Sequence, residues 1–253
     1  MTIIKNIIGR VMALWAIVIF VITMLFIIIP VWIVSSYPEP KRTIGIFNIF
    51  NLWMKVFFVM AGVRRIFRGR KEFATNDNFI FICNHSSYLD VALASPGIPG
   101  PNKTIAKIEM SRLPFFGMIY KSGSVLVDRK NEQSRQRSYG KMKEVLSMGL
   151  HMCIYPEGTR NKTAQPLQRF HDGAFRLAVD TEKKIVPAVI FYTSTVMPRN
   201  KTFYFWPHKV EMHFLTPITS TGKTIEALRE ESFDVMKEYI INHHKNTKKI
   251  SKY

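Results

Sequence analysis

Hydrophobic residues are concentrated toward the N-terminus of this chain. Residues 11–34 include no charged side chain. At 1.5 Å per residue such a stretch forms a helix of roughly 35 Å, which is long enough to cross a bilayer. The run is longer than the apolar core of a signal peptide, and the Ser35-Ser36-Tyr37-Pro38 segment that follows offers no good cleavage site. We therefore expect a retained membrane helix.

A second apolar stretch, residues 44–63, is interrupted only by Lys55. Basic residues flank the first run on both sides, so the positive-inside rule favours no simple crossing. A helical hairpin seated in one leaflet fits these flanks better, with the arginines after residue 63 lying along anionic headgroups. The alternative is that residues 44–63 form a core helix of a soluble domain. We expect residues 1–68 to be membrane-embedded helices and residues 69–253 to be a catalytic domain on the cytoplasmic face.

Downstream of this segment, short apolar runs alternate with helical patterns. Residues 79–83 form a continuous apolar run that is typical of a strand buried on both faces. The other predicted strands are 103–106, 124–127, 152–155 and 185–190, and the predicted helices are 87–94, 132–148, 172–180 and 224–244. Two closely spaced runs, 202–206 and 209–215, predict an added antiparallel pair. This alternation predicts an α/β fold with a mainly parallel central sheet flanked by helices.

The charge balance narrows the class of partner. The chain has 36 Lys and Arg residues against 18 Asp and Glu residues, a net charge of +18, which attracts polyanions. The apolar N-terminus favours a membrane over nucleic acid, and the basic C-terminal tail has no recognisable nucleic-acid module beside it. Cys83 and Cys153 lie inside apolar runs, which suits reduced thiols in a cytosolic compartment.

Two motifs indicate the chemistry. His85 leaves the strand at 79–83, and Asp90 follows five residues later. A carboxylate that accepts a hydrogen bond from one ring nitrogen leaves the other free to take a substrate proton. A pair with this spacing arises by chance in roughly one such chain in six, whereas Glu-Gly-Thr-Arg, present at residues 157–160, arises in about one in a thousand. His85, Arg129 and Glu157 each follow a predicted strand, so we expect them to face one crevice.

These residues resemble the glycerolipid acyltransferase family, specifically its 1-acylglycerol-3-phosphate O-acyltransferases, which have His-x4-Asp followed by Pro-Glu-Gly-Thr-Arg. The resemblance extends over residues 84–190. It also includes Ala106-Lys107, Leu113-Pro114-Phe115-Phe116-Gly117, the segment 123–129, and Val186-Pro187.

The resemblance implies acyl transfer from acyl-coenzyme A or acyl carrier protein directly onto the hydroxyl of a lysophospholipid, without a covalent acyl-enzyme. The base and its partner are His85 and Asp90, and 1-acylglycerol-3-phosphate is the expected acceptor. A thioester is reactive enough to need no enzyme nucleophile. Membrane lipids, the lysophospholipid and the acyl donor are the implied partners. We expect no nucleic acid, no metal, and no cofactor beyond the acyl co-substrate.

The implied acceptor site consists of Lys107, Arg129, Glu157, Gly158, Thr159 and Arg160. Guanidinium groups suit a phosphate because each can contact two oxygens. Backbone N–H groups around Gly158 and Thr159 are candidates for holding the phosphate or a developing oxyanion. His171 stands where the family often has a basic residue. Another lysolipid therefore remains an alternative acceptor.

Methionine and phenylalanine residues provide a candidate acyl-chain tunnel, because flexible thioether and aromatic surfaces accommodate alkyl chains. Ordinary core packing is an equal alternative for them. The residues concerned are Met54, Phe57, Phe58, Met60, Met110, Phe115, Phe116 and Met118.

Overall fold

The computed structural model describes residues 2–73, 77–113 and 116–250. Within these residues one seven-stranded sheet has the strand order β1-β7-β6-β2-β5-β3-β4. The strands are β1 (Arg65–Arg68), β2 (Ile80–Cys83), β3 (Asn102–Lys107), β4 (Ser124–Val127), β5 (His151–Ile154), β6 (Ile185–Phe191) and β7 (Val210–Phe214).

The direction of the strands confirms the predicted mainly parallel sheet. Pairing from β6 through β2, β5 and β3 to β4 is parallel throughout. β7 runs antiparallel to β6, and β1 runs parallel to β7 at the edge. The central strand β2 is 0% exposed at all four of its residues. Helices cover both faces of this strand, as its continuous apolar sequence predicts.

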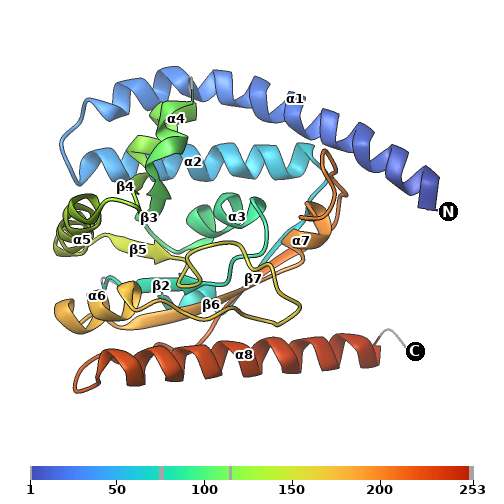
Figure 1. The fold of residues 1–253 in the computed structure, drawn as a ribbon. Coiled ribbons are helices and arrows are strands. Elements are labelled where there is room, and N and C mark those ends of the chain that lie inside the picture. The colour runs from blue at the N-terminus through green and yellow to red at the C-terminus, as the bar shows by residue number, and fades with distance from the viewer. Residues whose placement is uncertain (1, 74–76, 114–115, 251–253) are drawn as a thin grey trace.

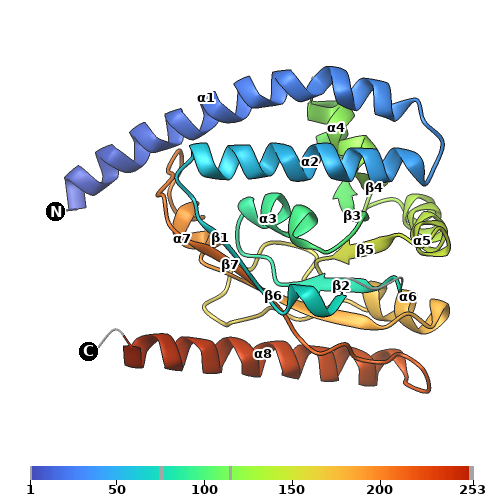
Figure 2. The same cartoon turned by 180° about the vertical axis from the view of Figure 1, so that it is seen from behind.

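Helices form layers above and below the sheet (Figure 1). On one face α3 packs next to the sheet, α2 lies over α3, and α1 is outermost, while α5, α6 and α8 contribute to the core of the other face (Figure 2). The helices are α1 (Thr2–Ser35), α2 (Lys41–Met60), α3 (Leu89–Gly97), α4 (Phe116–Ser122), α5 (Glu132–Ser147), α6 (Gly173–Thr181), α7 (Thr193–Val196) and α8 (Ile225–Ile250).

The two apolar helices α1 and α2 pack side by side as a hairpin (Figures 1 and 2). Both are long and apolar enough to cross a membrane. The inner face of α2 buries Trp53, Met54 and Phe58 against the α/β layer. In contrast, α1 leaves Phe26 and Trp32 uncovered, at 77% and 68% exposed. The hairpin therefore has one helix that also serves as a core helix and one that presents an apolar surface.

The edge of the sheet corrects one prediction. Residues 202–206 form no strand; Phe205 N–H donates to the carbonyl of Gly9, and Trp206 N–H donates to that of Val196. β7 pairs instead with β6 and with β1, a strand that was not predicted because Arg65–Arg68 is short and begins and ends with arginine. The first strand of the sheet thus lies just before the expected boundary at residue 68.

Candidate active site

The carboxyl end of β2 is fixed to its neighbour β6 by one side chain. The amide of Asn84 donates to the carbonyl of Ile190 at 3.0 Å and accepts from the N–H of the same residue at 2.7 Å. Asn84 is buried and follows the last residue of β2, Cys83. The backbone at His85, the next residue, is therefore placed by the sheet itself. The His85 side chain is 18% exposed.

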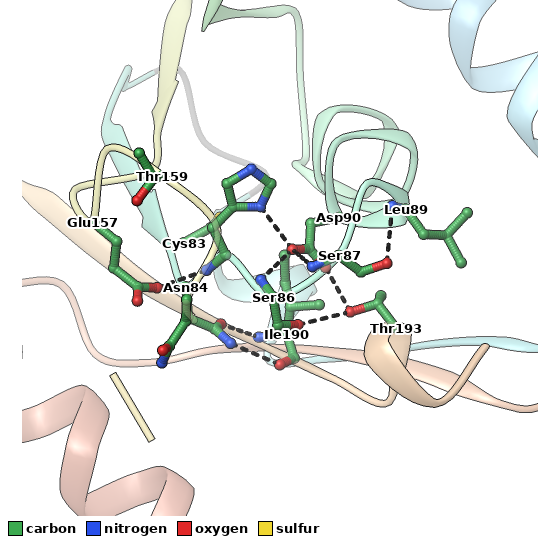
Figure 3. Close-up of polar contacts among 12 residues, drawn as sticks. Cys83, Asn84, Ser86, Ser87, Leu89, Asp90, Glu157, Thr159, Ile190 and Thr193 are labelled. Atoms are coloured by element: carbon green, nitrogen blue, oxygen red, sulfur yellow. Dashed lines mark hydrogen bonds and ion pairs between the residues drawn. The ribbon is translucent and has the colours of Figure 1, made fainter. Parts of the chain in front are cut away.

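His85 and Asp90 form the predicted pair. Asp90 lies in the first turn of α3, which begins at Leu89, and its Oδ2 is 2.8 Å from the Nδ1 of His85. The same oxygen accepts the backbone N–H groups of Ser86 and Ser87 at 2.6 and 2.8 Å (Figure 3). Asp90 is 0% exposed. A carboxylate acceptor selects the tautomer that carries the proton on Nδ1, which leaves Nε2 with a lone pair.

Buried side chains without a charge lie near the His85 ring, namely those of Tyr155, Cys83 and Cys153. The ring of Tyr155 is 4.5 Å from it between centroids, and burial first, then nearby thiols, raises the pKa of Tyr155 well above its usual value. The Sγ atoms of Cys83 and Cys153 are 4.0 Å apart. Their hydrogen bond, together with burial, raises the pKa of Cys83 well above its usual range. Because a thiolate is the nucleophilic form, Cys83 is unsuited to forming a covalent intermediate.

Glu157 braces the loop that carries the histidine. Its Oε1 accepts the backbone N–H of His85 at 2.7 Å, and its Oε2 accepts that of Gln168 at 2.9 Å. The carbonyl of His85 accepts the N–H of Asn161 at 2.7 Å. Glu157 is 3% exposed, and burial raises its pKa despite the two N–H donors. With both oxygens occupied by backbone groups, its carboxylate lies behind the site rather than at its surface.

Gly158 is the one position in this loop where only glycine fits. Its φ is +67°, and a Cβ there would lie 2.9 Å from Cδ2 of His171. Its carbonyl accepts a hydrogen bond from Arg129. Its N–H donates to the carbonyl of Tyr155 at 3.0 Å, so this N–H is already used within the loop. The sequence suggested that backbone N–H groups around Gly158 and Thr159 hold the phosphate or an oxyanion. The N–H of Gly158 already has the carbonyl of Tyr155 as its acceptor.

A groove of about 1460 Å³ opens beside the His85–Asp90 pair. Among its lining residues, the guanidinium of Arg160 stacks on the ring of Tyr88 at 3.5 Å. His171, which stands where the family often has a basic residue, also lines it. Six of the predicted site residues contribute to its wall: His85, Lys107, Arg129, Gly158, Thr159 and Arg160. The remaining two, Asp90 and Glu157, lie buried directly behind His85.

The rest of the groove is largely apolar. It extends between α1, α2, α3 and α4, where Phe20 of α1 and Ile46 and Phe50 of α2 line it. Some of the methionine and phenylalanine residues considered for an acyl-chain tunnel line this groove, and others pack in the core. Met54, Met110 and Phe116 line the groove, Phe57 and Phe58 pack in the core, Met118 packs against that core, Met60 is 46% exposed, and Phe115 lies outside the described residues.

One residue of the site carried no recognisable sequence signal. Thr193, at the start of α7, is 0% exposed and donates its hydroxyl to Oδ1 of Asp90 at 2.5 Å. It is more than a hundred residues from its partner in sequence and belongs to none of the motifs. Among the described residues, no group of three or more His, Cys, Asp or Glu side chains is placed to hold a metal ion.

Comparison with known proteins identifies the family. Residues 64–191, just over half of the chain, match the family model described as acyltransferase, and the chain belongs to this family. The 1-acyl-sn-glycerol-3-phosphate acyltransferase of Cocos nucifera is 33% identical over 146 residues, which cover 57% of this chain and 47% of the relative. That of Escherichia coli strain K12 is 32% identical over 129 residues, covering 49% and 51%. The matched segments thus span about half the length of these two relatives.

A solved structure matches the whole fold. The crystal structure of the 1-acyl-sn-glycerophosphate acyltransferase PlsC from Thermotoga maritima superposes with a TM-score of 0.80 and 21% sequence identity. The match covers 94% of this chain and 97% of the other. The apolar α1–α2 hairpin and the α/β layer therefore have this fold.

Proposed function

We propose that this protein transfers a fatty acyl group from acyl-coenzyme A or acyl carrier protein to the free hydroxyl of 1-acylglycerol-3-phosphate, giving phosphatidate. One observation carries the proposal: His85, hydrogen-bonded to the buried Asp90, lines a groove that also has cationic residues and a largely apolar remainder. Such a groove suits a phosphate at one end and an alkyl chain at the other. The relatives named above, called 1-acyl-sn-glycerol-3-phosphate acyltransferases, support it.

His85 is the general base in this mechanism. Its Nε2 takes the proton of the acceptor hydroxyl while the oxygen attacks the thioester carbonyl. The tetrahedral intermediate then expels the thiolate, so that a C–O bond forms and a C–S bond breaks. The thiolate recovers the proton from Nε2. Asp90 stabilises the imidazolium that forms between the two steps.

The acceptor phosphate binds three cationic side chains that line the groove together with His85. These are Lys107, Arg129 and Arg160. Arg160 is preset by its stacking on Tyr88, which limits the conformational freedom lost on binding. Gly158 and Thr159 shape the loop under the phosphate. Glu157 acts through the backbone of this loop instead of contacting the substrate, because both of its oxygens are already occupied.

The α1–α2 hairpin anchors the enzyme to the membrane from which the lysolipid comes. The uncovered apolar face of α1 suits the acyl region, and the net charge of +18 suits an anionic surface. Helices α1 and α2 form this anchor, and β1 together with residues 69–253 forms the catalytic domain, on the cytoplasmic face where soluble acyl donors are available. No cofactor beyond the acyl donor takes part.

An acyl-transfer assay tests the proposal directly. The detergent-solubilised protein is offered palmitoyl-coenzyme A or palmitoyl acyl carrier protein, each with 1-acylglycerol-3-phosphate, a lysophosphatidylethanolamine or a monoacylglycerol. We expect phosphatidate to form at least about tenfold faster than the product of the phosphate-free monoacylglycerol, because a phosphate contact with arginine contributes about 1.5–3 kcal/mol. Equal rates for the two would contradict the phosphate site and favour another lysolipid. Release of free acid at one rate with and without acceptor would indicate a thioester hydrolase.

A further inference from the structure

The carboxylate of Asp90 is held by two separate segments of the chain, one after β2 and one after β6. Oδ2 receives its three donors from His85 and the two residues that follow, all on the segment that leaves β2. Oδ1 accepts a hydrogen bond from the hydroxyl of Thr193 at 2.5 Å (Figure 3). Thr193 follows β6, which is one neighbour of β2 in the sheet, whereas Glu157 follows β5, the other neighbour. Thr193 lies beyond the stretch that matches the family model, residues 64–191.

The two sets of donors have different physical consequences. The donors to Oδ2 come from the same short segment as the histidine, so they move together with it. A carboxylate held only at one oxygen can still turn about its Cβ–Cγ bond, because sp³–sp² torsions are broad. A donor on the second oxygen from a separate element removes this freedom. Thr193 is therefore the contact that fixes the plane of the carboxylate relative to the sheet.

The hydroxyl of Thr193 has a defined direction. It has one hydrogen, and the Asp90 carboxylate can only accept, so this hydrogen is directed to Oδ1. The Ser86 hydroxyl, 3.2 Å from the Thr193 oxygen, must then donate to it. The resulting chain runs from Ser86 through Thr193 to Asp90. Such chains strengthen each bond through mutual polarisation.

Helix α7 is itself firmly positioned. Trp206 N–H donates to the carbonyl of Val196 at 2.8 Å, and the Ser87 hydroxyl donates to the carbonyl of Met197 at 3.1 Å. Tyr192, just before α7, has a φ of +66°, a left-handed conformation that turns the chain sharply at the end of β6. Because its neighbours are fixed, Thr193 can transmit the geometry of the sheet to Asp90.

We propose that Thr193 is a positioning residue for the acyl transfer, acting through Asp90 to keep Nε2 of His85 aimed at the acceptor hydroxyl. This inference rests on the proposed function of the same site. Thr193 touches neither substrate, since it is fully buried behind Asp90. Its contribution therefore falls on turnover and not on substrate binding. Misorientation of a catalytic group by about 1 Å costs on the order of a hundredfold in rate.

The test uses isosteric variants of the full chain. Thr193→Val keeps the shape and removes the hydroxyl, whereas Thr193→Ser keeps the hydroxyl and removes the methyl group. We expect Thr193→Val to lower kcat about ten- to hundredfold with KM for both substrates unchanged within about twofold. Thr193→Ser should retain kcat within about threefold. Thr181→Val is the control, because its hydroxyl bonds only the carbonyl of Leu177 within α6, and its kcat should equal that of the wild type.

The possible outcomes separate the positioning role from the proposed function. A kcat of Thr193→Val near that of the wild type, an equal loss in the Val and Ser variants, or a loss expressed in KM contradicts the positioning role. If the Val variant does not fold, Thr193→Cys replaces it in the comparison with Thr193→Ser, since the two have similar size and S–H is a weak donor. An inactive wild type would instead contradict the proposed function. An active wild type with an insensitive position 193 would contradict this inference alone.

Discussion

The Nδ1 atom of His85 lies 2.8 Å from Oδ2 of Asp90, across the junction between the central strand β2 and helix α3. The strand fixes the histidine through the neighbouring Asn84, and the helix fixes the aspartate in its first turn. A short loop between two rigid elements thus sets the tautomer and orientation of His85. This arrangement determines what substitutions around the pair should do.

Asp90→Asn keeps the shape of the side chain and removes the charge that stabilises an imidazolium. The amide can also favour the wrong tautomer of His85 by donating to Nδ1. We expect kcat to fall by about 10²–10⁴ while KM for the acyl donor changes little. Steady-state kinetics with saturating lysolipid measures this. A variant with wild-type kcat would show that His85 does not work as a base held by Asp90.

Glu157→Gln separates a bracing role from a substrate-binding role. The amide has one oxygen, so one of the backbone N–H groups of His85 and Gln168 loses its acceptor. We expect a loss of about 1–3 kcal/mol in the free energy of unfolding and a lower kcat. Thermal unfolding and kinetics measure the two effects. Glu238→Gln, exposed on α8, is the matched control and should change neither. A raised KM for the acceptor with unchanged stability would assign Glu157 to substrate binding.

Arg160→Ala tests the phosphate site. Removal of the guanidinium should raise KM for 1-acylglycerol-3-phosphate about tenfold or more, because it removes a charge-assisted contact made equally in the ground and transition states. Tyr88→Leu removes the ring that presets Arg160 and should produce a smaller increase. Neither change should affect a phosphate-free acceptor. Comparable effects on both acceptors would place Arg160 outside the phosphate site.

His151 gives the fold an acid sensitivity that is independent of catalysis. It is 5% exposed, its Nδ1 accepts the N–H of Phe79 at 3.0 Å, and its Nε2 lies 3.1 Å from the carbonyl of Pro99. Burial lowers its pKa from 6.5 to about 4, although the bond to Pro99 acts in the opposite direction. Between these values the unfolded chain binds more protons than the folded one, so stability is lost as the pH falls.

The expected loss between pH 6.5 and 4 is on the order of 3 kcal/mol. Thermal unfolding at a series of pH values measures it. His151→Gln keeps one acceptor and one donor but cannot take up the proton, so its stability should vary less over the same range. Parallel curves for the two proteins would show that His151 does not cause the acid sensitivity.

Local sequence was sufficient for the part of the site that is continuous along the chain. The apolar run of β2 predicts that His85 leaves a buried strand, and the five-residue spacing places Asp90 in the following helix. The family motif places Arg160 near the same groove. The buried position of Glu157 was not predictable, because motif membership does not show whether a carboxylate faces substrate or backbone.

The remaining features depend on tertiary contacts. Thr193 meets Asp90 only because β6 and β2 are neighbours in the sheet, although 103 positions separate the two residues. β1 is formed by Arg65–Arg68, and its pairing with β7 outweighs a composition unsuited to a strand. Residues 202–206 have a β-type sequence but form no strand. Their backbone instead forms hydrogen bonds to Gly9 of α1 and Val196 of α7.

The rate of acyl transfer by His85→Ala, compared with the wild type under identical conditions, tests the central claim most directly. The assay follows a labelled acyl chain from the thioester to 1-acylglycerol-3-phosphate, and thermal unfolding verifies that the variant is folded. General base catalysis contributes about 10²–10⁴ in rate, so we predict a loss of at least about a hundredfold at an unchanged unfolding temperature. A folded His85→Ala protein that transfers the acyl chain at the wild-type rate would contradict the account.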